Sequence, residues 1–378
     1  MRPASELETR RLSETFAALC AIPSPSRCEG AVAAYVRNEL EQIGLEVAED
    51  DAAAAVGGQS GNLLARIGNR GGQSVLFCAH LDTVPHEGGV LPVLVDGGWE
   101  SDGDTILGAD NKAAVAVLLE LARRTTIEGA PVDLELCFTV AEEPGLLGAN
   151  ALDISALRSE VGYVYDHATP IGEIIGASPT HIRWRADIRG RPAHAGIAPE
   201  DGRSAITAAA RAIAALPDGR IDQSTTANVA RIRGGVAGTN VVPEHCQVDG
   251  EVRSLEQGRA ELMTEAVAEA FQDAANRPDC QCDLDLTIER SFVGYKLDEG
   301  EPSVVAAKAA LEACGYEPKI VASGGGSDAN ALRAKGVDCV NLANGTQNPH
   351  QPSERVAVAE LEAMLNVTFA LVDVFGED

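Results

Sequence analysis

The strongest constraint on the fold is an alternation between short apolar segments of strand length and segments with helical patterning. Three stretches read as strands, SVLFCAHLDTVP (74–85), VDLELCFTV (132–140) and GYVYD (162–166), and NKAAVAVLLELARR (111–124) reads as a helix between the first two. Strands that alternate with helices form a largely parallel sheet, which the helices cover on both faces. The pattern therefore predicts an α/β fold with a mixed, mostly parallel sheet and helices on both faces.

The same pattern extends toward both ends of the chain. Helices are expected at 5–20 and at 29–43, where the second ends at Gly44, and NLLARIG (62–68) reads as a strand. After residue 290 we expect a helix at 303–314, strands near KIVAS and CVNLAN, and a C-terminal helix.

A different pattern occupies the middle of the chain. HIRWRADIRG (181–190) places apolar side chains on one face and polar ones on the other, which is typical of a sheet with one solvated side. A helix at 204–216, strands at 225–234 and 245–254, a helix at 258–275 and a strand at 282–291 follow. This β-α-β-β-α-β order predicts an inserted ferredoxin-like α+β domain. The expected division is 1–174 and 291–378 for the two parts of the α/β domain, and 175–290 for the insert.

Composition excludes some classes of function. The formal net charge of −27 argues against binding to nucleic acid or to anionic membranes. The nine cysteines are scattered, with no disulfide framework, which fits a reducing compartment. The N-terminal stretch has no apolar signal-peptide core, and no run approaches the length of a membrane span. These features predict a cytoplasmic protein.

Polar residues that could carry chemistry follow the predicted strands. Sites in open α/β sheets form outside the carboxyl ends of the strands, so these groups are expected to converge in one crevice. They are His80 and Asp82 in AHLDTVP, Asp110 in GADNKAA, Glu142 and Glu143 in TVAEEPG, Asp166 in YDH, and His350 in NPHQPSE.

Two histidines and several carboxylates, without thiolate, form a ligand set that suits Zn²⁺, or Mn²⁺ or Co²⁺ in similar geometry. Carboxylates gathered without a cation would repel one another, and two divalent ions would neutralise them if one carboxylate bridged both. Of the adjacent Glu142 and Glu143, one is then expected to bind metal and the other to accept a proton from water. The residues alone do not say which does which.

Each of these features has an ordinary explanation when taken singly. A His-x-Asp after a strand is commonly a hydrogen-bonded pair, an aspartate before a helix is commonly an N-cap, and adjacent glutamates commonly form a solvated turn. The site hypothesis depends on their occurring together around one predicted sheet.

The motifs AHLDTVP, GADNKAA, AEEPGLLGA and NPHQPSE in combination resemble those of the M20 group of dinuclear zinc peptidases. The resemblance covers essentially the whole chain, and YDHATPIGEI, PAHAG and GGSDAN are most similar to the peptidase T-like branch. It implies two Zn²⁺ per subunit and a homodimer formed through the inserted domain, which would also act as a lid.

The resemblance also implies roles for individual residues. His80 and Asp166 would ligate one zinc, Glu143 and His350 the other, and Asp110 would bridge them. A cis peptide bond is expected between Asp110 and Asn111. Asp82 would hydrogen-bond His80 and fix its ring, and Glu142 would be the general base.

In the inserted domain, the resemblance implies that His194 of RPAHAG reaches the partner subunit's active site and stabilises the oxyanion. Asn240 and Arg253 match substrate-holding positions, and Gly325 in SGGGSDAN would bring backbone close to substrate. The simpler alternatives are a surface-loop histidine for His194, a strand-face salt bridge for Arg253 and an ordinary turn at the glycines.

The expected function is hydrolysis of amide bonds in short peptides by an M20-like metallopeptidase, with peptidase T-like aminopeptidase activity as the leading case. The alternatives are an N-acyl or N-carbamoyl amino acid amidohydrolase and a dipeptidase or carboxypeptidase of the same family. A metal-binding protein without catalysis is a further alternative, but it would not need the free base that Glu142 would supply.

Overall fold

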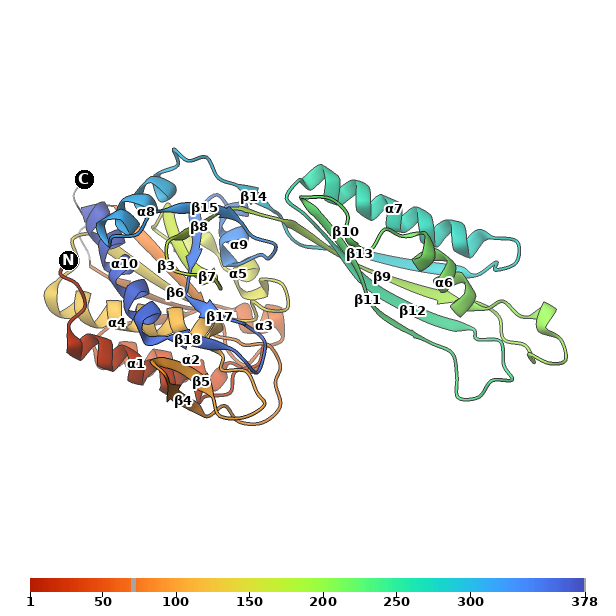
Figure 1. Cartoon of the computed structure of the whole chain (residues 1–378), viewed down its shortest axis with the longest axis horizontal. Helices are drawn as coiled ribbons and strands as arrows, with labels where there is room; N and C mark the ends of the chain where they lie inside the picture. Colours follow the sequence, from red (N-terminus) through yellow and green to blue (C-terminus); the bar gives the residue numbers. More distant parts are fainter. Residues whose placement is uncertain (69–72, 377–378) are drawn as a thin grey trace. The chain divides into compact units, whose positions relative to one another are not determined.

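The computed structural model describes residues 1–68 and 73–376. The chain forms two compact units, of which the first comprises Met1–Ala177 and Lys296–Asp378 and the second Ser178–Tyr295 (Figure 1). The second unit is thus an insertion into the first.

The first unit is built on a nine-stranded mixed sheet with the order β1-β2-β6-β3-β7-β16-β8-β14, in which β15 also pairs with β8. The strands β6, β3, β7 and β16 form its parallel centre. The bounds are β1 (Val47–Glu49), β2 (Leu63–Ile67), β3 (Ser74–His80), β6 (Asp133–Thr139), β7 (Val161–His167), β8 (Glu173–Ser178), β14 (Tyr295–Lys296), β15 (Lys319–Ala322) and β16 (Asp338–Ala343).

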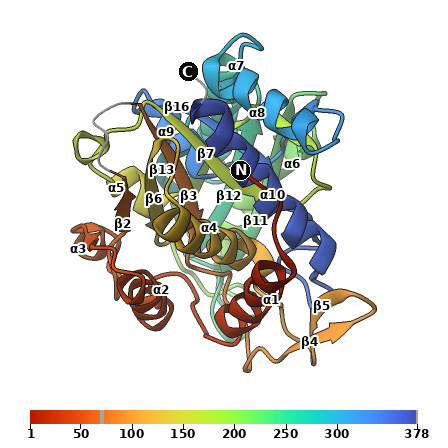
Figure 2. The ribbon, with the colours of Figure 1, turned by 90° about the vertical axis from the view of Figure 1, so that its left-hand side faces the viewer.

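Helices cover both faces of this sheet, which confirms the predicted fold class. Successive side chains of a strand point to opposite faces. On β3, Phe77 therefore packs into the core beneath α4, whereas Cys78 faces the other way and contacts Asp328 at the start of α9. Helices α1, α4 and α10 pack together (Figure 2). The bounds are α1 (Glu6–Cys20), α2 (Gly30–Gln42), α3 (Ala52–Val56), α4 (Ala109–Glu128), α5 (Leu147–Ala151), η1 (Ile154–Ala156), α8 (Pro302–Ala313), α9 (Asp328–Ala334) and α10 (Val358–Gly376).

A second, four-stranded sheet in this unit was not expected from the sequence. It has the order β17-β18-β5-β4 and joins β4 (Pro92–Val95) and β5 (Gly98–Ser101) to β17 (Thr346–Gln347) and β18 (Arg355–Ala357). All its pairings are antiparallel. The sheet matters for the site because His350 lies in the connection between β17 and β18.

The inserted unit has the predicted ferredoxin-like architecture. Its antiparallel sheet has the order β10-β11-β12-β9-β13, and α6 and α7 pack on one face. Alternate apolar residues of β9, such as Ile182 and Trp184, face these helices, as the sequence pattern predicts. The bounds are β9 (Thr180–Arg189), η2 (Pro199–Asp201), α6 (Ala205–Ala215), β10 (Gly219–Arg220), β11 (Thr225–Gly234), β12 (His245–Ser254), α7 (Gln257–Asn276) and β13 (Asp283–Phe292).

Within the described part of the chain, no helix combines the length and apolar character needed to cross a membrane.

Candidate metal centre

Five side chains from distant parts of the first unit come together, and Asp110 lies between two histidines. Asp110 Oδ1 is 3.4 Å from His80 Nε2, and Asp110 Oδ2 is 3.3 Å from His350 Nε2. Asp166 Oδ1 is 3.6 Å from His80 Nε2, and Glu143 Oε1 is 3.0 Å from His350 Nε2. The cluster therefore has two halves, His80 with Asp166 and His350 with Glu143, and the Asp110 carboxylate turns one oxygen toward each.

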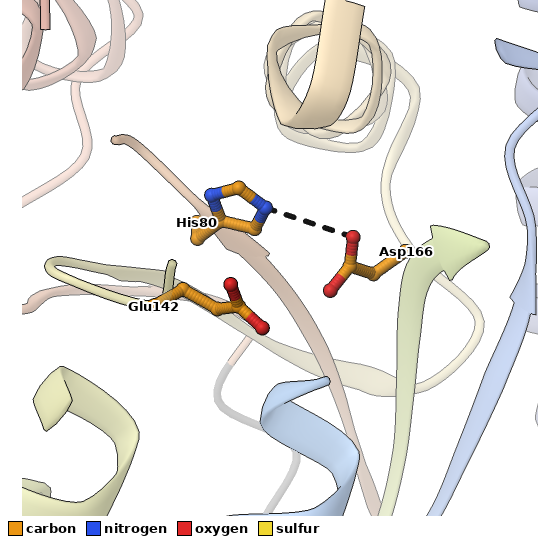
Figure 3. Close-up of side chains that lie close together, drawn as sticks. All are labelled: His80, Glu142 and Asp166. Atoms are coloured by element: carbon orange, nitrogen blue, oxygen red, sulfur yellow. Dashed lines mark ion pairs between the residues drawn. The ribbon is translucent and has the colours of Figure 1, made fainter. Parts of the chain in front are cut away.

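The parallel centre of the sheet positions one half of this cluster. His80 is the last residue of β3, and Asp166 lies near the end of the neighbouring parallel strand β7. The carboxyl ends of parallel strands meet at one edge of a sheet, so both side chains reach the same space. Glu142 follows β6, which also pairs with β3, and Figure 3 shows its carboxylate beside His80 and Asp166.

Asp110 comes from the first turn of α4. The backbone of Asp110 and Asn111 is not helical, and the peptide bond between them is cis, as the resemblance implies. The regular part of the helix thus begins after Asn111, and Asp110 belongs to the loop that leads into it.

His350 comes from a part of the fold that was not predicted from the sequence. It was expected to follow a strand of the main sheet, but it lies in the β17–β18 connection of the small sheet, with a positive φ of 65°. Its side chain is 45% exposed, whereas that of His80 is 1% exposed. The His80 half of the cluster is therefore buried, and the other half is exposed to solvent on the side of His350.

Burial and nearby charges shift the pKa values of Glu142, Asp166 and His80 in the buried half of the cluster. Burial raises the pKa of Glu142 well above its ordinary value, and the nearby Asp166 adds to this. Burial also raises the pKa of Asp166 to about 7, together with the charge of Asp110. Burial lowers the pKa of His80, but contacts with Asp110 and Asp166 outweigh it and hold that pKa well above its ordinary value.

The pKa of Asp110, the shared aspartate, is shifted downward instead. Burial would raise the pKa of Asp110, but its close contacts with His350 and His80 hold it well below its ordinary value. Close contacts with Asp110 and Glu143 in turn raise the pKa of His350 to about 10. In the absence of a cation, the raised pKa values of His80, His350, Glu142 and Asp166 all favour bound protons, which offset the crowding of carboxylates.

The residues present fit a pair of divalent cations. His80 Nε2, Asp110 Oδ1 and Glu143 Oε1 are buried and make no hydrogen bond of normal geometry, although His80 Nε2 faces Asp110 Oδ1 and His350 Nε2 faces Glu143 Oε1 as ion pairs. Buried polar atoms in native proteins normally have one, so three such atoms at one place require an explanation. Two groups, His80–Glu142–Asp166 and His80–Asp110–Glu143, each place their ligand atoms within 4.8 Å of one another. Nitrogen and oxygen ligands without thiolate suit Zn²⁺ or Mn²⁺.

Asp82 lies beside His80, as expected, and it also makes contacts that were not expected. His80 Nδ1 lies 3.0 Å from the backbone oxygen of Asp82 and 3.5 Å from its carboxylate, so the backbone is the nearer partner of the ring. The Asp82 carboxylate accepts hydrogen bonds from the backbone N–H of Glu142 at 2.9 Å, from that of Glu143 at 3.2 Å, and from the Ser26 hydroxyl at 2.7 Å. Asp82 therefore also holds the turn that presents both glutamates.

Among the buried acids beside the cluster that were not singled out from the sequence, Glu29 and Asp328 bond residues at the end of β6 or in the turn that follows it. Glu29, at the start of α2, accepts the backbone N–H of Ala141 at 3.0 Å and thus supports the same turn. Asp328 is 1% exposed and accepts hydrogen bonds from Thr139 Oγ1 and, at 3.8 Å, from Cys78 Sγ. SGGGSDAN contains Asp328, but a Ser-Asp pair before a helix also reads as an ordinary cap.

The remaining predicted residues are not among the side chains of the cluster described above. Gly325, in the β15–α9 loop, donates its backbone N–H to Ser323 Oγ. His194 and Asn240 belong to the inserted unit, where their loops are joined by a hydrogen bond from the Ala195 N–H to the Asn240 carbonyl and by a bridge between His194 and Val241.

Arg253, also in the inserted unit, forms the strand-face ion pair that was the simpler alternative. Its Nε donates to Glu251 Oε1 at 2.9 Å, and Glu251 Oε2 lies 3.0 Å from His181 Nε2. A role in substrate binding would require Arg253 to exchange or share this partner.

We expect the affinity of the metal-free protein for Zn²⁺ to rise with pH between about pH 6 and 8. A cation must displace the proton that His350 holds up to a pKa of about 10, and competition from that proton weakens as pH rises. Each displaced proton contributes about tenfold per pH unit. Zinc titrations in competition with a chromophoric chelator, corrected for the chelator's own pH dependence, measure this slope. An affinity for Zn²⁺ that does not change over this pH range would contradict the presence of protonated histidines at the site.

Comparisons with known proteins place this geometry in context. Residues 177–278 match the M20-type peptidase dimerisation domain, and residues 62–165 match peptidase family M28. An uncharacterized Bacillus subtilis protein, YqjE, is 37% identical over 368 residues, which cover 96% of this chain and 98% of that protein.

Two solved structures are similar over nearly the whole chain. Aminopeptidase PepT from Bacillus cereus is 38% identical with a TM-score of 0.85, and the match covers 97% of this chain and 98% of that one. A tripeptidase from Staphylococcus aureus is 30% identical with a TM-score of 0.91, and the match covers 98% and 99% of the two chains.

Proposed function

Because the chain belongs to the M20 metallopeptidases, in their peptidase T-like branch, we propose that it is a metal-dependent aminopeptidase that cleaves short peptides. The observation that carries the proposal is the Asp110 carboxylate, which turns one oxygen to His80 and the other to His350. This arrangement favours two adjacent cations that share one carboxylate.

His80 and Asp166 would hold one cation, His350 and Glu143 the other, and Asp110 both. Divalent cations held there would lower the pKa of water and polarise the carbonyl of the scissile amide. The preferred identity in this proposal is Zn²⁺, with Mn²⁺ or Co²⁺ as substitutes.

Glu142 is the proposed general base. Its carboxylate lies beside His80 and Asp166 and is buried, and this burial raises its pKa well above the ordinary value (Figure 3). It takes a proton from the attacking water as the oxygen bonds to the carbonyl carbon, and returns a proton to the nitrogen as the C–N bond breaks. Asp82 and Glu29 hold the backbone of the turn that aims it.

The finer parts of the proposal concern assembly and location. The dimerisation-domain match at 177–278 supports a homodimer formed through the inserted unit. Within such a dimer, His194 would stabilise the oxyanion in the partner's site, and Asn240, Arg253 and Gly325 would contact substrate. We also propose a cytoplasmic location.

A substrate panel tests the activity. Zinc-loaded protein should release the N-terminal residue from tripeptides with a free amine, and N-acetylation should lower kcat/KM by at least about 10²-fold. A site that binds a free amine leaves its own polar groups unpaired when that amine is blocked. Product analysis by mass spectrometry identifies the bond that is cut. Faster cleavage of N-acyl or N-carbamoyl amino acids would replace the aminopeptidase with an amidohydrolase.

A further inference from the structure

We propose that Glu354 is a positioning residue that holds the loop of Asp110 against the loop of His350 and so sets the affinity of the His350 half of the centre for metal. The proposal rests on the two-cation function above. Glu354 is 1% exposed and comes from the last position of NPHQPSE, four residues after His350.

The Glu354 carboxylate accepts three backbone hydrogen bonds from the loop that carries Asp110. Its Oε2 accepts the N–H of Leu107 at 2.9 Å and that of Gly108 at 2.8 Å, and its Oε1 accepts the N–H of Asp110 at 3.0 Å. Both oxygens are therefore engaged, and the third contact is made to the shared ligand itself.

These three amides would otherwise be left without partners. They lie in the loop before the regular part of α4, so the helix itself supplies no acceptor for them. A carboxylate close to the N-terminal end of a helix is also favoured by the helix dipole. α4 has no side-chain cap of its own, because the residue before it is Gly108, with a φ of 74°. Glu354 supplies the acceptor from a segment more than 240 residues away in sequence.

The other end of this contact is fixed by the small sheet. Glu354 directly precedes β18, which pairs with β5, and its own N–H bonds the carbonyl of Gln351 in the turn after His350. The side chain of Glu354 thus connects the turn that presents His350 with the loop that presents Asp110. The distance between the Asp110 Oδ2 and His350 Nε2 atoms, 3.3 Å, is set across this link.

The two halves of the centre depend on this link to different degrees. His80 and Asp166 are built into adjacent strands of the main sheet, and their positions do not require the β17–β18 connection. His350 is 45% exposed and lies in that connection. Loss of Glu354 is therefore expected to weaken metal binding in the His350 half much more than in the other half.

The test compares Zn²⁺ binding to the metal-free full-length parent and to Glu354→Gln, titrated in competition with a chromophoric chelator. Glutamine keeps the size but offers the loop an NH₂ group in place of one acceptor. The parent should bind two equivalents. In Glu354→Gln the affinity for the tighter Zn²⁺ equivalent should change less than about 3-fold. The affinity for the other equivalent should fall by about 10–100-fold, the usual effect of losing an outer contact of a metal ligand.

Glu135→Gln is the matched control. Glu135 is also 1% exposed and accepts two backbone N–H groups, from Arg158 and Ser159, but away from the centre. Glu135→Gln should keep the parent affinity for both Zn²⁺ equivalents, even if it lowers the melting temperature as much as Glu354→Gln does. The double variant Glu354→Gln/His350→Ala should bind its one remaining Zn²⁺ equivalent as tightly as His350→Ala does, because the half of the centre that Glu354 supports is already lost in both.

The outcomes separate the two proposals. A parent that binds only one equivalent overturns the two-cation function, and with it this inference. If the parent binds two Zn²⁺ equivalents and Glu354→Gln binds both as tightly as the parent, the inference alone is overturned. The same holds if Glu135→Gln loses as much affinity for the second equivalent as Glu354→Gln does. If Glu354→Gln does not fold, Glu354→Asp decides: its shorter reach should weaken only the second equivalent, and parent affinity for both would refute the role.

Discussion

Replacement of Glu142 by glutamine is expected to lower kcat by about 10²–10⁴-fold, the range that general acid–base groups contribute, while both metal equivalents stay bound. Glutamine has the same shape, so the turn held by Asp82 should keep its conformation. It cannot accept a proton, however, and the leaving amine then has no donor. Steady-state kinetics with a tripeptide, together with metal analysis of the same sample, measure both effects.

The neighbouring glutamate provides a sharp contrast for this prediction. Glu143 Oε1 lies 3.0 Å from His350 Nε2, so Glu143→Gln should weaken metal binding, and activity should return at high Zn²⁺. Excess metal should not rescue Glu142→Gln. If Glu142→Gln turns over at the parent rate, or if the two variants exchange these phenotypes, the assignment of base and ligand is wrong.

Replacement of Asp110 by asparagine is expected to abolish measurable turnover and to weaken at least one metal equivalent by more than about 100-fold, which exceeds the usual cost of losing an outer contact. The reason is geometric, because one carboxylate faces both histidines. An amide offers one oxygen and a nitrogen that does not coordinate at neutral pH. Chelator competition and activity assays over a range of Zn²⁺ concentrations measure the loss.

Asp338→Asn is a suitable control for that variant. Asp338 accepts the Ser303 N–H and pairs with Arg333, at the opposite end of β16 from the centre, so its loss should affect stability without changing metal binding. Two tight equivalents in Asp110→Asn would show that this carboxylate is not shared.

Much of the fold could be predicted because its signals are local. The strand that ends at His80 and the alternating face of β9 follow directly from side-chain periodicity, as does the β-α-β-β-α-β order of the insert. The same signals placed His80, Asp166 and the Glu142–Glu143 turn near one edge of a sheet. Their individual roles came from the resemblance, because neighbouring carboxylates look alike in a single sequence.

What could not be predicted depends on contacts between segments that are distant in sequence. The small sheet pairs β5 with β18, more than 250 residues later, through strands only three or four residues long. Nothing local marks these strands, so the route by which His350 arrives was missed. Glu354 was missed for the same reason, since its partners are backbone amides of another loop.

Asp82 shows a different limit. Its proximity to His80 was predicted, but its carboxylate also accepts backbone amides of the turn after β6. Sequence motifs identify which residues are present, whereas backbone N–H groups are the same at every position. The partners of a buried carboxylate therefore become visible only when the chain path is known.

The small sheet also bears on when the centre can form as the protein is made. His80, Asp110, Glu143 and Asp166 all precede the inserted unit, and His350 follows it. A nascent chain that emerges from the ribosome in this order carries most of the ligands long before it has His350 or β18. Peptide hydrolysis thus has to await translation of the segment that carries His350 and β18, and a nascent chain without that segment is not yet a protease.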